Sequence, residues 1–223
     1  MNKEEHILLL FPHPDDETFS AAGTIMMHKR EHGTKVTVAS LTSGEMGRNW
    51  GNPPVANRET LPFIRQKELQ NACDIMGVDE LLHLGYRDKT LEFEDGQTLA
   101  SHLRKVILDV DPSLVITFYP GLSIHPDHDA TGAAVVEAMR KIPESKRPKL
   151  HTKAITANAV EEIGDADIVY DIGNLLMERK LQAIDAHESQ MQEVSAITKQ
   201  KIAEGDEDTE AWIRYEEFWI YEV

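Results

Sequence analysis

The chain has 223 residues, of which 23 are Lys or Arg and 39 are Asp or Glu, so its formal net charge at pH 7 is −16. That length suits one well-buried domain, and the acidic balance argues against nucleic acid or an anionic membrane as a general partner. The single cysteine, Cys73, excludes an intrachain disulfide and suits a reducing compartment. We find neither a signal-peptide layout nor an apolar run of the ~18 residues that a membrane span needs, and we expect a cytoplasmic protein.

The first two thirds of the chain alternate between strand and helix patterns. Short apolar or β-branched runs predict strands at 7–11, 35–41, 80–84 and 114–119, and apolar residues at helical spacing predict helices at 19–30, 62–76, 98–110 and 130–141. This alternation is typical of a mostly parallel, doubly wound α/β sheet. The polar segment 42–61 is long for a loop, and such loops are often functional.

The last third of the chain has a different pattern. We expect strands at 154–157 and 168–172, one long helix over 173–202, a solvated acidic segment at 204–210 and a final strand within 212–223. The whole chain, 1–223, would then form a single domain, with a core of about 1–141 and a C-terminal strand and helix extension of about 150–223. Neither a Gly-x-Gly-x-x-Gly motif nor a Walker loop is present, so nothing indicates a nucleotide cofactor.

Two polar motifs follow two of the predicted strands. Pro12-His13-Pro14-Asp15-Asp16-Glu17 comes directly after the first strand, and His125-Pro126-Asp127-His128 lies in the loop after strand 114–119. Because the carboxyl ends of parallel strands meet at one edge of a sheet, we expect the motifs to converge. A single His-Pro-Asp is commonly a surface loop or a helix cap. Two of them at equivalent strand ends favour a catalytic zinc site, which needs about three nitrogen or oxygen ligands and an open position for water.

Together the two motifs resemble the LmbE-like, or PIG-L, family of zinc-dependent N-acetylglucosaminyl deacetylases. Further similar segments follow in order: Gly44-Glu45, Arg65 with Glu68, 85–88, and Lys180 with 187–190. The resemblance implies a Rossmann-like fold and one zinc ion per chain, although iron, cobalt or manganese would also suit such ligands. Within the family the chain is most similar to the deacetylases of bacillithiol biosynthesis, their second paralogue in particular. This similarity implies N-acetylglucosaminyl-malate as substrate, with acetate and a free amine as products.

The resemblance also implies a role for each motif residue. The zinc ligands would be His13, Asp16 and His128. Hydrolysis of an amide also needs a base, an oxyanion donor and an acid for the leaving amine. Asp15 would be the general base, and His125 would stabilise the oxyanion or protonate the amine. Asp127 would orient one of the histidines without contacting the metal.

Substrate contacts are expected from polar residues of the neighbouring segments, each of which also has an ordinary interpretation. Glu45 could bond sugar hydroxyls or face solvent, and Arg65 could bind a malate carboxylate or pair with Glu68 at i,i+3. The arginines would supply local positive charge in an otherwise acidic chain. The full set of candidates is Glu45, Arg48, Arg58, Arg65, Arg87, Asp88 and His187.

Other functions stay open at this point. A phosphoesterase with two metals would usually need more carboxylates. A non-enzymatic metal- or sugar-binding module would need neither Asp15 nor His125. A deacetylase for another N-acetylated sugar, or an amidase for mercapturate-type thiol conjugates, would use the same site. In the enzymatic case we expect a small-molecule glycoside as partner, and the aromatic C-terminal segment is compatible with a homo-oligomer.

Overall fold

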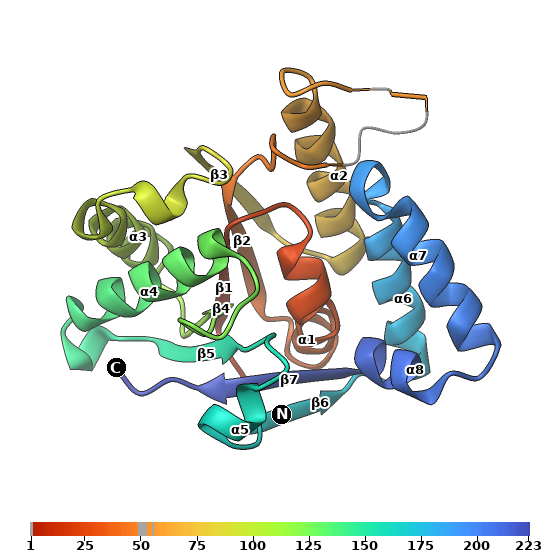
Figure 1. Cartoon of the computed structure of the whole chain (residues 1–223). Coiled ribbons are helices and arrows are strands. Elements are labelled where there is room, and N and C mark those ends of the chain that lie inside the picture. The colour runs from red at the N-terminus through yellow and green to blue at the C-terminus, as the bar shows by residue number, and fades with distance from the viewer. Residues whose placement is uncertain (1, 49–52, 55) are drawn as a thin grey trace.

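The computed structural model describes residues 2–48, 53–54 and 56–223, and its central feature is one seven-stranded sheet (Figure 1). The strand order is β3-β2-β1-β4-β5-β7-β6. The pairs from β3 to β5 are parallel, whereas β7 runs antiparallel to both β5 and β6. The strands are β1 (His6–Phe11), β2 (Lys35–Thr42), β3 (Glu80–Tyr86), β4 (Leu114–Phe118), β5 (Lys149–Lys153), β6 (Ile168–Asp171) and β7 (Tyr215–Ile220).

Helices cover both faces of the sheet, as the doubly wound pattern predicts. Helices α3 and α4 pack together on one face, and α1, α2 and α6 pack together on the other, with α7 and α8 outside α6 (Figure 1). The bounds are α1 (Asp16–His32), α2 (Leu61–Met76), α3 (Gly96–Val110), α4 (Pro126–Arg140), α5 (Ala159–Ile163), α6 (Gly173–Asp185), α7 (Glu188–Ala203) and α8 (Glu207–Arg214), with single 3-10 turns at Leu91–Phe93 and Glu144–Lys146.

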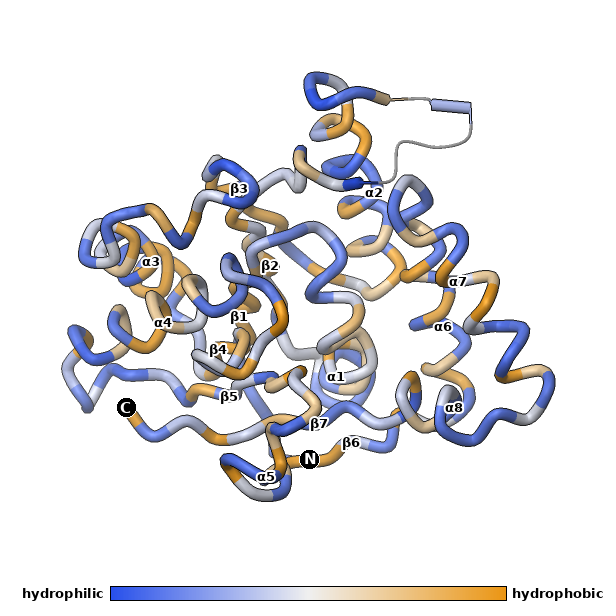
Figure 2. Tube along the Cα trace, viewed as in Figure 1, coloured by the Kyte–Doolittle hydropathy of each residue, from blue (hydrophilic) through white to orange (hydrophobic). Residues whose placement is uncertain are grey.

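Strand β1 is buried on both faces. Ile7, Leu9 and Phe11 belong to the apolar cluster under α1 and α6, and Leu8 and Leu10 belong to the cluster under α3 and α4. Figure 2 shows the same distribution, with hydrophobic segments concentrated at the centre of the sheet. Because β1 pairs with β2 on one side and β4 on the other, the loops after β1 and β4 flank the point where the strand order reverses. Ligands of open α/β sheets bind at that point.

Three sequence predictions need correction. The strand predicted at 154–157 is wrong: the strand that pairs with β4 is β5, and it ends at Lys153. The long helix predicted at 173–202 is two helices, because the chain turns at His187 to bury this side chain. Helix α4 starts at Pro126 rather than at residue 130, so Asp127 and His128 lie in its first turn. The acidic segment 204–210 is mostly solvent-exposed, as expected, and α8 begins within it, at Glu207.

The other predicted elements are confirmed to within a few residues. Helix α1 begins three residues early, at Asp16, and the final predicted strand is β7. The described residues between Thr42 and Leu61 form neither helix nor strand, and positions 49–52 and 55 of that predicted loop lie outside the described residues. No helix in the described part of the chain is long and apolar enough to span a bilayer.

Candidate active site

Three potential metal ligands converge where the loop after β1 meets the first turn of α4. His13 Nδ1 lies 3.2 Å from His128 Nε2 and 3.3 Å from an oxygen of Asp16, and His128 Nε2 lies 3.3 Å from the other Asp16 oxygen. A tetrahedral ion about 2.0–2.1 Å from its nitrogen and oxygen ligands would hold them roughly 3.3–3.4 Å apart. The three donors therefore fit one face of such a coordination sphere, and their chemistry suits zinc and similar divalent metals.

The far nitrogen of His13 is held by two carboxylates. Its Nε2 lies 3.2 Å from an oxygen of Asp127 and 3.2 Å from an oxygen of Asp88. Asp127 has no exposed surface, and its two oxygens also accept the backbone N–H groups of Lys89 and Leu91. A carboxylate on the outer nitrogen of a histidine fixes the ring so that the other nitrogen presents its lone pair. Asp127 and Asp88 thus aim His13 Nδ1 at the donor cluster.

Charge at the cluster shifts the pKa values of its members. Burial opposes a charge on His13, but hydrogen bonds to Asp127, Asp16 and Asp88 raise its pKa well above the ordinary value. Burial also opposes the charge on Asp16, yet the neighbouring His128 and His13 hold the pKa of this carboxyl far below its usual range. An anionic Asp16 beside two imidazole nitrogens is an arrangement that attracts a cation.

Asp15 is held in an unusual conformation beside the donors. Its φ is 114°, which L-residues rarely adopt, and such strain persists only where surrounding groups enforce it. Arg65 donates to an Asp15 oxygen at 3.0 Å and to the backbone oxygens of Pro14 and Gly44, while Glu17 accepts the Asp15 N–H at 3.2 Å. Burial raises the pKa of Asp15 to about 6, and the charge of Arg65 opposes this rise.

Gly44 is required for this contact. Its φ is +62°, and a Cβ added there would lie 2.0 Å from the Arg65 guanidinium. The loop after β2 can therefore pass against Arg65 only with a glycine at this position.

His125 is the N-cap residue of α4 and lines the polar cavity together with Asp15. Its Nδ1 accepts the backbone N–H of Asp127 at 3.1 Å, which assigns the ring proton of neutral His125 to Nε2. The ring packs edge-on against His13 at 4.8 Å between centroids. Burial lowers the pKa of His125, and the charges of His13 and His128 lower it further. A neutral imidazole with Nε2–H available can donate a hydrogen bond to a developing oxyanion.

Two other groupings of potential ligands include His13, one with His125 and His128 and one with Asp88 and Asp127. In the first, His125 Nδ1 is already engaged by a backbone N–H. In the second, both carboxylates accept backbone N–H groups besides bonding His13. Asp16 also accepts a backbone N–H, that of His13 at 2.9 Å, but only on Oδ2. Its Oδ1, 3.3 Å from His128 Nε2, accepts none from the residues that the structure describes, and this favours the set His13, Asp16 and His128 for an ion.

Two cavities adjoin the donor cluster, and Asp15, Asp16 and His128 line both of them. The smaller has a volume of about 380 Å³ and is polar. It is lined in addition by His13, Met46, Gly47, Arg48, Arg65, Asp88, Lys89, His125 and Gln190. The larger has a volume of about 750 Å³ and mostly apolar walls. Both are large enough for a small ligand, and the shared carboxylates lie between them.

The substrate residues predicted from the sequence divide into three groups. Arg48 and Asp88 line the polar cavity, and Asp88 also contacts His13 Nε2. Arg65 is buried in its contacts with Asp15 and the two backbone oxygens, and Glu45 accepts the N–H of Asp88 at 3.0 Å. The remaining three lie outside both cavities. Arg58 and Arg87 are exposed, and His187 is buried against Thr18 and Glu17.

Sequence reasoning missed two kinds of residue. Lys89 and Gln190 line the polar cavity. Gln190 lies in the family-like segment 187–190, but neither residue was among the predicted site residues. Lys153 lines the larger cavity. It was missed because the strand was predicted at 154–157, which put Lys153 before the strand rather than at its carboxyl end. The usable signal was the position of Lys153 at the carboxyl end of a strand parallel to β4, on the ligand side of the sheet.

Fold and site together define a class of protein: a doubly wound α/β domain with a candidate His/Asp metal site at the switch point of its sheet. Residues 8–139 match the family described as PIG-L, GlcNAc-PI de-N-acetylase. The chain belongs to this family of metal-dependent de-N-acetylases, which hydrolyse an amide bond. The family predicted from the two motifs is thereby confirmed.

The chain is also similar to individual proteins along nearly its whole length. It is 46% identical over 218 residues, or 98% of either chain, to a Bacillus cereus protein named "Probable N-acetyl-alpha-D-glucosaminyl L-malate deacetylase 2".

Two solved structures show the fold alone. The N,N'-diacetylchitobiose deacetylase from Pyrococcus horikoshii aligns with a TM-score of 0.76 at 24% identity, covering 98% of this chain and 84% of that one. GalB, the 4-carboxy-2-hydroxymuconate hydratase from Pseudomonas putida, aligns with a TM-score of 0.71 at 18% identity, covering 98% and 97%. Because one neighbour is a deacetylase and the other a hydratase, the fold does not determine the reaction.

Proposed function

We propose that this chain hydrolyses the N-acetyl amide of N-acetyl-α-D-glucosaminyl L-malate, giving glucosaminyl malate and acetate, as a deacetylase of bacillithiol biosynthesis. The convergence of His13 Nδ1, Asp16 and His128 Nε2 beside Asp15 carries the proposal for the reaction. The 46% identity to a protein named for this substrate supports the choice of glycoside. The polar cavity, with its charged and amide side chains, suits a hydroxylated sugar.

In this proposal His13, Asp16 and His128 hold one divalent metal ion, zinc by preference for such ligands. When bound, the ion lowers the pKa of a water molecule and polarises the amide carbonyl. Asp127 and Asp88 keep the His13 ring in the orientation and tautomer that ligation needs. We assign proton transfer and stabilisation of the oxyanion to side chains of the protein.

Asp15 acts as the general base. Its carboxylate lines both cavities next to the ligands, and Arg65 fixes one of its oxygens, so that the other stays available to accept a proton from water. A base with a pKa of about 6 is ionised at neutral pH and still binds a proton strongly enough to take it from water.

His125 acts on the substrate side. Its Nε2–H donates to the oxyanion as the carbonyl carbon becomes tetrahedral. A proton must then reach the amine nitrogen as the C–N bond breaks. The protonated Asp15, which holds the proton taken from water, can deliver it, whereas a neutral His125 keeps its Nε2–H. The glucosamine amine leaves with that proton and acetate remains.

The test is acetate release from N-acetyl-α-D-glucosaminyl L-malate by zinc-loaded protein, beside Asp15→Asn and the exposed control Asp109→Asn. We expect turnover by the wild type and the control, and a loss of about 10²–10⁴-fold in kcat in Asp15→Asn. Asp15→Asn should still bind about one zinc per chain, because Asp15 is not a ligand in this proposal.

Unchanged turnover in Asp15→Asn would remove its role as base. A requirement for two ions per chain would point instead to a two-metal hydrolase. Full metal binding by the wild type without hydrolysis of any N-acetylated sugar would leave a metal-binding module.

A further inference from the structure

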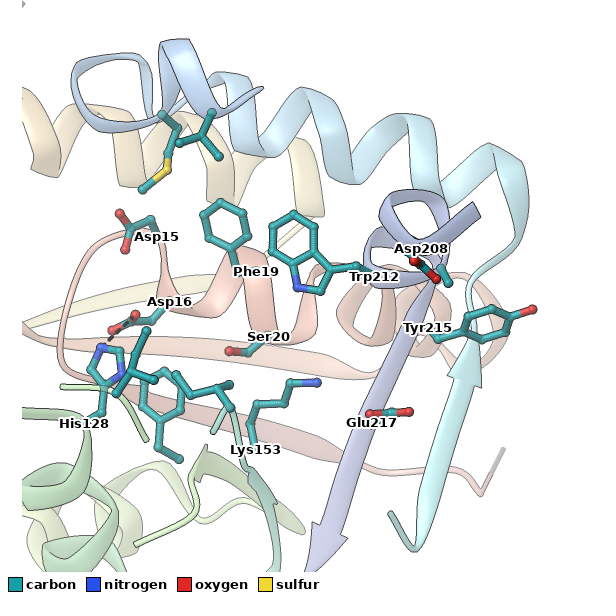
Figure 3. Close-up of a pocket in the computed structure, with 16 residues that line it drawn as sticks. Asp15, Asp16, Phe19, Ser20, His128, Lys153, Asp208, Trp212, Tyr215 and Glu217 are labelled. Atoms are coloured by element: carbon teal, nitrogen blue, oxygen red, sulfur yellow. Dashed lines mark ion pairs between the residues drawn. The ribbon is translucent and has the colours of Figure 1, made fainter. Parts of the chain in front are cut away.

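The larger cavity contains a feature that the proposed chemistry does not use. It extends from Asp15, Asp16 and His128 toward β7 and α8 (Figure 3). Most of its wall is apolar, being formed by Phe19, Phe118, Ile124, Ile155, Met191, Val194, Ala211 and Trp212. Hydrogen-bond donors within this wall include the Ser20 hydroxyl, the Lys153 ammonium and the Trp212 indole N–H, and the Tyr215 hydroxyl lies farther out, beyond Asp208 (Figure 3). In Figure 3 Ser20, Lys153 and Trp212 lie between Asp16 at one end of the cavity and Asp208 at the other, and the Lys153 ammonium extends toward the side on which Glu217 lies.

The three donors come from elements far apart in the sequence. Ser20 lies in the second turn of α1, Lys153 is the last residue of β5, and Trp212 lies in α8. The Trp212 ring is fixed by stacking on Phe19, with 5.7 Å between centroids and 26° between planes. The indole is therefore held in place before any ligand binds, which lowers the entropy cost of using its N–H.

None of the three donor groups is engaged elsewhere. Among residues 2–48, 53–54 and 56–223, no hydrogen-bond or ion-pair partner contacts Lys153 Nζ, Ser20 Oγ or Trp212 Nε1. Burial, together with the charge of Lys180, lowers the pKa of Lys153, and Glu216 and Glu217 only partly offset this. A cation desolvated by an apolar wall without a counter-ion costs free energy, and an anionic ligand group would recover it.

We propose that Ser20, Lys153 and Trp212 form a subsite that binds a carboxylate of the substrate's aglycone. The inference rests on the proposed function and adds the place where the malate is recognised. In an N-acetylglucosaminide the aglycone is attached to the sugar carbon next to the one that carries the acetamide. With the acetamide at the ligands shared by both cavities, the sugar occupies the polar cavity and the aglycone enters the larger one.

The acidic groups around the larger cavity limit where an anion can sit. Asp15 and Asp16 lie at its inner end, and Asp208 and Glu217 lie toward its outer end (Figure 3). Asp208 and Glu217 repel a carboxylate from the outer end, and Lys153 attracts it to the part of the cavity between the two ends. The subsite therefore selects for the position of the anionic group as well as for its charge.

The competing location for the carboxylate is the polar cavity, whose wall includes the cations Arg48 and Lys89. Arg48 is exposed, so water screens its charge, whereas the charge of Lys153 acts through an apolar surrounding. Substitution of each cation in turn distinguishes the two locations.

The experiment compares two substrates that differ only in the aglycone: N-acetyl-α-D-glucosaminyl L-malate and the neutral methyl N-acetyl-α-D-glucosaminide. In zinc-loaded Lys153→Met we expect kcat/KM for the malate glycoside to fall about 10- to 100-fold, chiefly through KM. For the methyl glycoside the value should stay within about twofold, since no charged contact is lost. Lys153→Arg should recover part of the loss, and Lys67→Met, on the exposed side of α2, is the matched control.

Trp212→Phe is a second, milder variant, because phenylalanine keeps an aromatic ring to stack on Phe19 while it removes the N–H and part of the ring area. It should show the same selective loss at roughly 3- to 10-fold. Equal losses on both substrates in Lys153→Met and Trp212→Phe would overturn the subsite, because they would indicate a structural role. A selective loss in Arg48→Gln or Lys89→Gln, with none in Lys153→Met, would place the carboxylate in the polar cavity.

A readout that does not depend on turnover separates this inference from the proposed function. The lysines of the wild type are labelled with an amine-reactive reagent, and labelling of each is followed by mass spectrometry with and without L-malate. We expect L-malate to protect Lys153 but not Lys67, and to do so more weakly in Trp212→Phe. Protection of Lys153 without hydrolysis would refute the proposed function and support the subsite. Hydrolysis without protection of Lys153 would support the proposed function and refute the subsite.

Discussion

Single residues at this site are held mainly by hydrogen bonds from distant segments. Asp15 depends on Arg65, which lies 50 residues further along the chain, and His13 depends on Asp127, which lies 114 residues away. The contacts of Arg65 explain why it is buried, and they remove it from the arginines that could bind a substrate carboxylate. Four arginines were predicted for that role. Arg48 and Arg65 line the polar cavity, but the charge of Arg65 is paired with Asp15, which leaves Arg48 as the candidate.

A prediction at the same scale concerns His151, a buried histidine outside the site. Burial lowers its pKa to about 4, against the ordinary 6.5. Between these pH values the unfolded chain binds a proton that the folded chain does not, so the free energy of unfolding must fall as the pH falls through this window. The histidine accounts for up to about 3 kcal/mol of that decrease.

The variant His151→Leu should therefore lose less stability than the wild type when the pH is lowered from 7 to 4.5. Urea unfolding at a series of pH values measures this difference. Above pH 7 the two proteins should change in parallel, because His151 is neutral there in both states. Equal slopes for the two proteins between pH 6.5 and 4.5 would show that His151 is not the responsible group.

At the scale of elements, the site depends on how closely α4 packs on the end of β4. Helix α4 starts at Pro126, with His125 as N-cap, so Asp127 and His128 occupy its first turn. The approach is close because residue 132 has no side chain: a Cβ on Gly132 would lie 2.5 Å from the Phe118 backbone oxygen. The helix that carries a proposed metal ligand is thus set by contact with the strand before it.

Gly132→Ala should displace α4 and destabilise the protein by about 1–3 kcal/mol, as expected for overpacking against backbone. The same displacement should weaken zinc binding, because His128 lies one turn earlier in the helix. Urea unfolding and competitive zinc titration measure the two effects. Gly96→Ala is the matched control, because a Cβ there meets no atom within 4 Å, and it should leave both quantities nearly unchanged.

At the scale of the whole molecule, one buried ion pair joins the C-terminal third to the first helix. Lys180 of α6 lies 2.7 Å from Glu216 of β7, and the two side chains are 2% and 1% exposed. Glu216 also accepts the backbone N–H groups of Gly23 and Thr24 in α1. This pair holds β7 and α6 against α1, which begins with the proposed ligand Asp16, so the antiparallel end of the sheet supports the candidate site.

Removal of one partner should be severe, because it leaves the other charge buried and unpaired. We expect Lys180→Met to lower the free energy of unfolding by about 3–5 kcal/mol. The exposed pair of Lys199 and Asp185 is the control, since Lys199→Met should cost less than about 1 kcal/mol. Urea unfolding measures both, and a cost for Lys180→Met no larger than that of the control would show that Glu216 is satisfied by the backbone alone.

The sequence by itself determined the fold class and the central cluster of the site. A fully apolar β1 specifies a strand buried on both faces, and the motifs after β1 and β4 are contiguous, so the meeting of parallel strand ends was enough to bring His13, Asp15, Asp16 and His128 together. Local patterns did not decide where β5 lies or that the helix over 173–202 breaks, because the strand is chosen by pairing with β4 and the break by the burial of His187.

Only the tertiary structure decided which polar residues support the cluster and which remain free for a ligand. Asp88 behind His13, Arg65 on Asp15, and the group of Ser20, Lys153 and Trp212 all join segments that are distant in sequence. Such contacts form when whole helices and strands pack together. They produce no periodic pattern in the amino-acid sequence from which they could be predicted.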